Sequence, residues 1–256
     1  MPSLLFYEKP VALNKVAHKD VKIAPLGGDY RFAAKTNSVI MAGIEFAEAA
    51  KEFPVVFAKA GNDRILPVAL LGMRNNENLF VGEDGKWDGR YVPAFVRRYP
   101  FVLAQVPESK DLTVCIDTAY PGYKAKDGQK LFEKDGANTQ LLQRAIDFLS
   151  DYQRQYKRTE AFIQTLADLD LFMSLSAKVN MTSGQQFALT GFMVIDEKKL
   201  LKLEDADALK LFRAGELAWV YSHLLSLSNL SRLVDKVATR AGGEAPAKAE
   251  EAEATA

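Results

Sequence analysis

Four residues within one short stretch carry side chains that could recognise a ligand. Trp87 and Tyr91 lie four positions apart, and Arg97 and Arg98 follow them. Exposed aromatic rings combined with guanidinium groups anchor protein interfaces and bind sugars or carboxylates. The alternative is that the rings belong to the core and that the arginines pair with acidic neighbours, which is the commoner arrangement. We take these four residues as the predicted ligand-binding set and assign no catalytic residue.

Asp117 is the carboxylate whose position best fits catalysis. It directly follows the apolar run 112–116, and active-site carboxylates do occur at the ends of strands. Capping of a turn is the commoner role for such an aspartate. Were Asp117 to share a deep pocket with Trp87, Arg97 and Arg98, the chain would be an enzyme of unknown reaction. Because no nucleophile or base accompanies Asp117, a non-enzymatic binding or structural protein is the leading hypothesis.

A metal site would need His18, Asp20 and His223 to converge as two histidines and one carboxylate. His223 lies in a leucine-rich segment, where a solvated histidine or one at the edge of the core is the ordinary outcome. We therefore predict no metal and no cofactor.

Two acidic segments also favour turns over sites. Asp196 and Glu197 adjoin Lys198 and Lys199, which indicates a solvated turn. The loop 82–89 contains three glycines and three acidic residues but lacks the ordered oxygen spacing of an EF-hand. We predict a turn there, not a calcium site.

Prolines mark the ends of the elements that position the candidate residues. Pro93 fits the first turn of a short helix, and Pro100 cannot continue it, so the strand 101–106 follows directly. Upstream, an apolar helical stripe stops at Pro54 and becomes the strand 55–58. Short polar connections then predict antiparallel pairing. The further strands expected in this half lie within 11–21, 30–33, 65–71, 79–81 and 112–116.

From Asn138 the apolar period becomes helical. We expect one helix from there, a second helix capped by Thr159, and pairing of the two as a hairpin. A β-hairpin follows, then a helix from Asp205 that Gly215 ends, and a last helix from Glu216 to about Val237. The β-hairpin strands are 177–182 and 186–195.

These elements predict an α+β fold. The N-terminal half holds an antiparallel sheet with two short helices, and the C-terminal half is mainly helical with one β-hairpin. We expect a sheet-rich lobe at 1–136 and a helical lobe at 137–240 packed on it. Residues 241–256 have no large apolar side chain, which predicts a disordered tail.

Composition places the chain among ordinary soluble proteins. Of 256 residues, 48% are hydrophobic, and 33 basic residues balance 33 acidic ones, so no charged field would gather nucleic acid or acidic lipid. The single Cys115 lies in an apolar strand and excludes an internal disulfide, which fits a reducing compartment. No signal-peptide pattern and no apolar span of about 18 residues is present. We expect a cytoplasmic chain without a membrane span, whose protein partner or small ligand is unknown.

Several segments together resemble the bacterial SapC family. The resemblance rests on five segments: 45–57, the run Pro67–Gly72, 78–81, the stretch Tyr91–Phe101, and the run Gly191–Glu197. It covers nearly the whole chain except the tail. The family is associated by name with surface-layer proteins, so the resemblance implies a bacterial protein linked to surface-layer assembly or export. It implies no catalytic residues.

Overall fold

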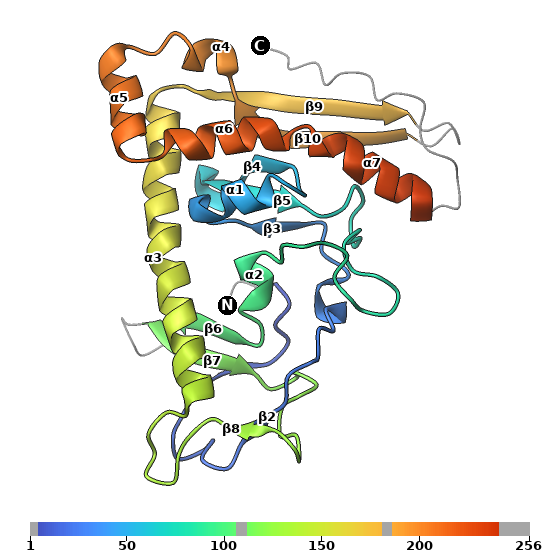
Figure 1. Ribbon diagram of the computed structural model, residues 1–256, viewed down its shortest axis with the longest axis vertical. Helices are drawn as coiled ribbons and strands as arrows, with labels where there is room; N and C mark the ends of the chain where they lie inside the picture. Colours follow the sequence, from blue (N-terminus) through green and yellow to red (C-terminus); the bar gives the residue numbers. More distant parts are fainter. Residues whose placement is uncertain (1–4, 106–111, 181–185, 241–256) are drawn as a thin grey trace.

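The computed structural model describes residues 5–105, 112–180 and 186–240 (Figure 1). The helices are α1 (Phe46–Ala49), α2 (Ala94–Arg97), α3 (Gln140–Asp168), α4 (Glu197–Leu200), α5 (Asp205–Arg213), α6 (Leu217–Ser226) and α7 (Asn229–Arg240). The strands are β1 (Pro10–Ala12), β2 (Lys22–Ile23), β3 (Ser38–Ile40), β4 (Val55–Lys59), β5 (Ile65–Leu70), β6 (Phe101–Gln105), β7 (Leu112–Asp117), β8 (Gln129–Lys130), β9 (Phe172–Asn180) and β10 (Gln186–Ile195). The predicted α+β class is confirmed. The expected tail, 241–256, lies outside the described residues.

The strands form separate antiparallel sheets where the sequence predicted a continuous one. The largest has the order β3-β5-β4-β10-β9, and a second has the order β1-β7-β6, while β2 pairs with β8. The larger sheet therefore combines strands from the first 70 residues with the hairpin that ends at Ile195. Sequence periodicity indicates that a segment is a strand but does not select its partner, which explains the difference. The division into two lobes at 136 stays a prediction.

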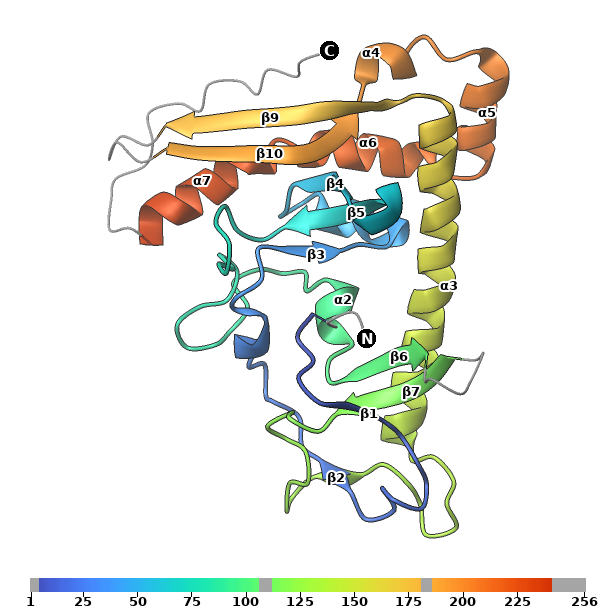
Figure 2. The ribbon, with the colours of Figure 1, turned by 180° about the vertical axis from the view of Figure 1, so that it is seen from behind.

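The helix α3 connects the two main sheets (Figures 1 and 2). Its 29 residues would span about 44 Å. Its first half buries Leu142 and Leu149 in the core beside β6 and β7, and its second half buries Phe162 and Leu166 in the core of the larger sheet. One helix thus packs against both hydrophobic cores.

The predicted helical hairpin with Thr159 as a cap is wrong, because α3 passes through that position without interruption. The buried Thr159 hydroxyl donates to the carbonyl of Gln155 at 2.8 Å and accepts the Gly43 N–H at 2.8 Å. Threonine satisfies its hydroxyl within a helix in this way, so its preference for caps did not decide the local structure.

The C-terminal helices lie across one face of the larger sheet (Figure 1). The single helix expected from Glu216 is in fact two, α6 and α7. Gly215 follows α5 with a φ of 72°, and this backbone conformation suits glycine at a helix end, as predicted.

In the N-terminal half, the strands expected within 30–33 and 79–81 are absent from the described residues. The first is a 3-10 turn over Arg31–Ala33, and Val81 makes only an isolated bridge to Trp87.

Candidate functional site

The candidate site is the loop and short helix from 82 to 98. Its first turn closes through the Gly82 N–H, which donates to the carbonyl of Lys86 at 2.8 Å. The Asp84 carboxylate accepts the Lys86 N–H at 3.0 Å, so it serves the turn. The prediction of a turn in the glycine-rich loop is confirmed.

Trp87 is part of the packing of this stretch. The indole is half-buried and its Nε1–H donates to the carbonyl of Tyr91 at 2.9 Å. Its ring stacks on Phe80 at 6.0 Å between centroids and packs edge-on against Phe53 and Tyr30. The indole N–H is therefore already used to hold the loop.

Two buried glutamates, which sequence reasoning missed, hold the stretch in place. Glu45 is 5% exposed, and its Oε1 accepts the Tyr91 hydroxyl and the Ala94 N–H, both at 2.7 Å. Its Oε2 accepts the Ala42 N–H at 2.9 Å. Burial raises the pKa of Tyr91 above its ordinary value, and the neighbouring Glu45 carboxylate adds to the shift.

Glu52 is the second of these glutamates, and it is 7% exposed. Its Oε1 accepts the N–H of Arg90 at 2.7 Å and the N–H of Tyr91 at 3.2 Å. Its Oε2 is buried and has no hydrogen-bond partner among the described residues. In sequence, both glutamates look like exposed helical acids, because the loop that covers them comes from about 40 residues later.

Arg97 and Arg98 occupy different environments although they are neighbours in sequence. Arg97 is exposed, its Nε donates to the carbonyl of Val92 at 2.9 Å, and its guanidinium lies 5.2 Å from the Phe148 ring. Arg98 lies 3.8 Å above the Phe95 ring, and its buried Nε has no hydrogen-bond partner in the described chain. Within the described ranges neither arginine forms an ion pair with a carboxylate, so the expected acidic partners are not found.

Two cavities flank Tyr91. The smaller, which we call the Arg97 cavity, has a volume of about 160 Å³ and lies between α2, α3 and the segment 42–48. It brings together two of the four predicted residues, Tyr91 and Arg97, whereas Trp87 and Arg98 do not line it.

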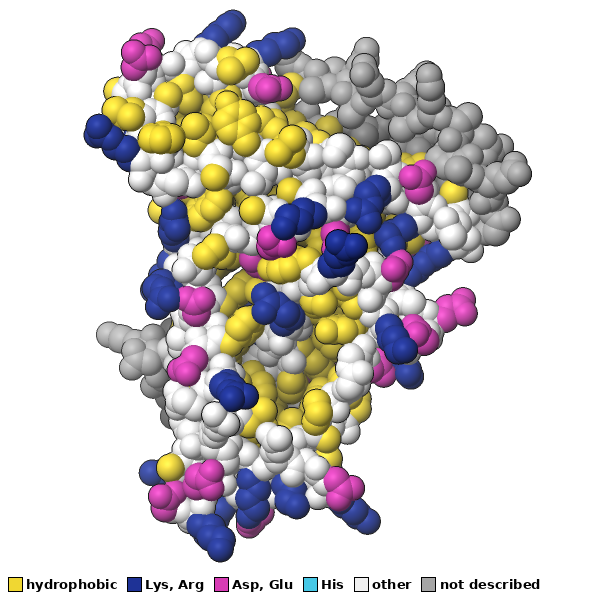
Figure 3. Space-filling model, in the orientation of Figure 1, with side chains coloured by type: hydrophobic (Ala, Val, Ile, Leu, Met, Phe, Trp, Pro, Cys, Tyr) yellow, Lys and Arg dark blue, Asp and Glu magenta, His cyan; other side chains and the backbone are white. Residues whose placement is uncertain are grey.

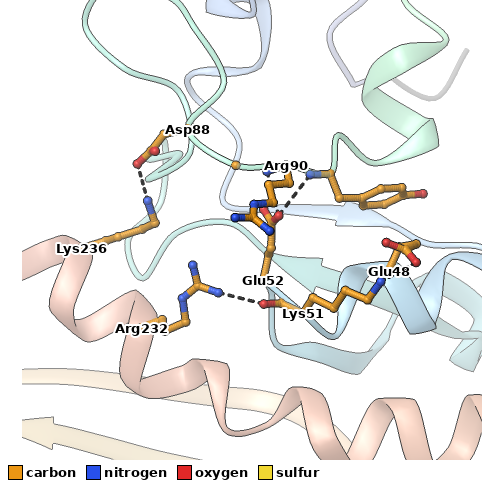
Figure 4. Close-up of a pocket in the computed structure, with 9 residues that line it drawn as sticks. Glu48, Lys51, Glu52, Asp88, Arg90, Arg232 and Lys236 are labelled. Atoms are coloured by element: carbon orange, nitrogen blue, oxygen red, sulfur yellow. Dashed lines mark hydrogen bonds and ion pairs between the residues drawn. The ribbon is translucent and has the colours of Figure 1, made fainter.

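The larger, which we call the Glu52 cavity, has a volume of about 600 Å³. Figure 4 shows side chains from α7 and from the loop facing one another across it, with Glu52 on the third side. The charged residues that line it include Lys51, Glu52, Asp88, Arg90, Arg232 and Lys236.

Asp117 is a structural cap. The carboxylate is fully buried and accepts the N–H groups of Glu8 at 3.0 Å, Lys9 at 2.9 Å and Ala119 at 3.0 Å. Its fourth contact is the Tyr99 hydroxyl at 3.4 Å. Asp117 does not line the Arg97 cavity. The residues proposed for an enzyme pocket therefore do not all converge there, and the commoner role of Asp117, capping a turn, is the one observed.

Cys115 is buried against Tyr7 and Val102, as a small core residue, and burial raises the pKa of its thiol.

Asp196 caps the N-terminus of α4 by accepting the N–H groups of Lys198 at 2.9 Å and Lys199 at 3.1 Å. The solvated turn predicted there is thus the start of a helix. The Asp196 carboxylate thus stabilises the N-terminus of α4.

His223 is fully buried and bonded through both ring nitrogens. Its Nδ1–H donates to the carbonyl of Val55 at 2.7 Å, and its Nε2 accepts the Ile195 N–H at 3.1 Å. Burial lowers its pKa to about 4, so the ring is neutral at neutral pH. His18 is half-buried, and its Nδ1 accepts the Asn14 N–H at 3.0 Å. No group of three metal-ligating side chains occurs among the residues the structure describes.

Ser226 and Asn229 follow His223 at intervals of three residues, and all three side chains form hydrogen bonds to the backbone of the segment 50–55. The Ser226 hydroxyl accepts the Val55 N–H at 2.9 Å, and the Asn229 amide donates to the carbonyl of Ala50 at 2.7 Å. His223, Ser226 and Asn229 thus lie at intervals of three and fasten α6 and α7 to the segment 50–55. The pattern His-x-x-Ser-x-x-Asn was visible in the sequence, but only the fold shows what it binds.

The fold and the site define an α+β protein in which buried carboxylates hold an aromatic loop between two cavities. The SapC family model matches residues 13–233, so the chain belongs to the SapC family. No curated protein and no solved structure matches the chain. In the part of the chain that the structure describes, no helix is sufficiently long and apolar to cross a membrane.

Proposed function

We propose that the chain is a non-enzymatic, cytoplasmic binding protein that holds a protein partner during bacterial surface-layer assembly or export. The link to the surface layer comes from the association carried by the family name. The observation that carries binding of a protein is a group of exposed apolar side chains on the C-terminal helices.

Figure 3 shows apolar side chains gathered over α5 and α6. Phe212 is 66% exposed and Leu225 is 71% exposed. Leu209 and Tyr221 are also exposed large hydrophobic residues of these helices, and we call these four residues the apolar patch. Tyr221 and Leu225 lie four apart on α6, which places them on one side of the helix.

Burying a large apolar side chain contributes about 1.5–3 kcal/mol relative to leaving it exposed. Contiguous exposed apolar side chains on a soluble protein mark interaction sites. Acidic and basic residues lie close to the patch residues in the sequence, among them Asp207, Lys210, Arg213 and Glu216. An apolar centre with a polar rim is the usual composition of a protein interface, so the partner should present apolar side chains of its own.

Copurification from the native bacterium tests this proposal. We expect the full-length chain to retain a surface-layer protein or a component of its export system, and the Phe212→Ser/Leu225→Ser variant to lose it. Val16→Ser is the matched control, because Val16 is 80% exposed and lies outside the patch. Equal recovery of the same partners by the double variant would show that the patch is not the interface.

A further inference from the structure

We propose that the Glu52 cavity binds a short zwitterionic molecule, an amino acid or a di- or tripeptide. In this arrangement the ligand carboxylate faces Arg90 and Arg232, and its ammonium group faces Glu52. The cavity volume of about 600 Å³ lies within the range of small-molecule sites, which is about 300–1,000 Å³. The site is separate from the apolar patch and does not depend on it.

Four basic residues line the cavity, and two of them are paired with carboxylates. Lys51 pairs with Glu48 at 2.6 Å, and Lys236 pairs with Asp88 at 2.5 Å. By contrast, no ion pair to a carboxylate is found in the described part of the chain for Arg90 or Arg232. Both line the cavity.

Arg232 uses one nitrogen, Nη1, to donate to the backbone carbonyl of Lys51 at 2.8 Å. A guanidinium group has five N–H donors in a planar fork that matches a carboxylate. Among the described residues, most donors of Arg232 and the guanidinium of Arg90 therefore have no partner and can hold a ligand anion at the cavity.

The acidic side of the cavity lacks a donor. Glu52 is more than nine-tenths buried, and its Oε1 is satisfied by the backbone of Arg90 and Tyr91. The Oε2 has no partner among the described residues, and a buried acceptor without a donor is unfavourable. An ammonium group supplies up to three donors and the opposite charge.

Gly89 is the part of the cavity wall in contact with this oxygen. A Cβ atom at position 89 would lie 2.4 Å from Oε2, so no other residue type fits there unchanged. Oε2 itself is shielded from solvent, so binding of an ammonium group to it requires the Gly89 segment to move.

The sign of the charge at Glu52 separates a zwitterion from a simple anion. A phosphate or a dicarboxylate would satisfy Arg90 and Arg232, but it would place negative charge near the buried Glu52 carboxylate. Like charges in a poorly solvated site repel strongly. A ligand with an ammonium group at one end and a carboxylate at the other satisfies both sides.

Calorimetric titration of the full chain with dialanine, N-acetyl-dialanine and dialanine amide tests the proposal. We expect dialanine to bind, and we expect acetylation of the ammonium group or amidation of the carboxylate to weaken binding by about tenfold or more. The Glu52→Gln variant retains an acceptor for the two backbone N–H groups. It should bind dialanine and N-acetyl-dialanine equally, because a side-chain amide cannot discriminate in favour of the ammonium group.

The Arg232→Gln variant should weaken binding of dialanine but not of the amide. Arg144→Gln is the matched control, since Arg144 is exposed on α3 and lies outside the cavity. Thermal unfolding of each variant establishes that it is folded. If Glu52→Gln does not fold, the three ligands on the unchanged chain decide the question by themselves.

Two outcomes would overturn the proposal. One is the absence of binding of glycine, dialanine and trialanine at ligand concentrations up to about 10 mM. The other is equal affinity for dialanine and N-acetyl-dialanine in the unchanged chain, which would leave an anion site that does not use Glu52.

Discussion

The imidazole of His223 replaces a direct contact between strands at Val55. The register of β4 with β10 pairs Phe57 with Met193, and continuing it would place Val55 opposite Ile195. The ring lies between these two residues and bonds to the carbonyl of the first and the N–H of the second. A side chain of α6 thereby completes the sheet where the two strands separate.

Acid should destabilise the protein through this ring. Burial lowers the pKa of His223 from 6.5 to about 4, so at mildly acidic pH the unfolded chain takes up a proton that the folded chain does not. The contribution of neutral His223 to the unfolding free energy is fully present above the pKa of histidine in the unfolded chain. It is lost as pH falls toward the lower pKa of His223 in the folded chain. It amounts to about 2 kcal/mol between about pH 7 and about pH 5.

Urea denaturation of the unchanged chain and of His223→Gln at both pH values measures this effect. Glutamine offers a donor and an acceptor but does not titrate in this range. The difference in unfolding free energy between the two proteins should shrink at the lower pH. A difference that does not change with pH would show that the ring is not held in its neutral form.

Replacement of Glu45 by Ala should be severely destabilising. The substitution leaves the Tyr91 hydroxyl and the N–H groups of Ala42 and Ala94 without their acceptor. Hydrogen bonds to charged groups contribute about 1.5–3 kcal/mol each, so we expect a loss of about 3 kcal/mol or more. Glu48→Ala is the matched control, since exposed ion pairs contribute about 0–1 kcal/mol. Equal urea midpoints for the two variants would contradict the structural role of Glu45.

The two arginines should differ in their effect on stability. Arg97→Ala removes an exposed side chain and should change the unfolding free energy by less than about 0.5 kcal/mol. Arg98→Ala removes a guanidinium that lies over the Phe95 ring at 3.8 Å and near the rings of Tyr7 and Tyr152. We expect a loss of about 1–2 kcal/mol, because such contacts are stronger when desolvated. Thermal unfolding of the single variants checks this, and the reverse order would be inconsistent with the structure.

Thr159→Val should weaken the contact between α3 and the segment that carries Gly43. Valine has a similar shape but cannot accept the Gly43 N–H, which would then be buried without a partner. The cost should be about 1–3 kcal/mol. Thr159→Ser keeps the hydroxyl and should recover most of the loss. Urea denaturation measures both, and a fully stable valine variant would exclude this contact as a source of stability.

The sequence predicted those features of the fold that depend on local pattern. The β-hairpin ending at Ile195, the helix starting at Asp205 and its end near Gly215 all follow from apolar periodicity and capping residues. The partner of each strand does not follow from them. Pairing of β10 with β4 joins segments about 135 residues apart, and nothing in either segment specifies the other.

The candidate site was predictable only in part for the same reason. The stretch containing Tyr91 and Arg97 was recognised because its residue types are distinctive, and the structure places both on one cavity. Glu45 and Glu52 were missed because their burial depends on a loop that returns over them from later in the chain. His223 was expected to be solvated or at the edge of the core. In the fold it is fully buried, and both of its ring nitrogens form hydrogen bonds to the backbone.

The order of strands in the larger sheet has a consequence for how the protein is made on the ribosome. The strands β3, β4 and β5 leave the exit tunnel early, but β4 has no neighbour on its other side until β10 has been synthesised. An unpaired strand edge is a template for association with other chains. The nascent chain therefore carries an open β4 edge through the synthesis of more than 100 further residues, and a chaperone that shields this edge would raise the yield of folded protein.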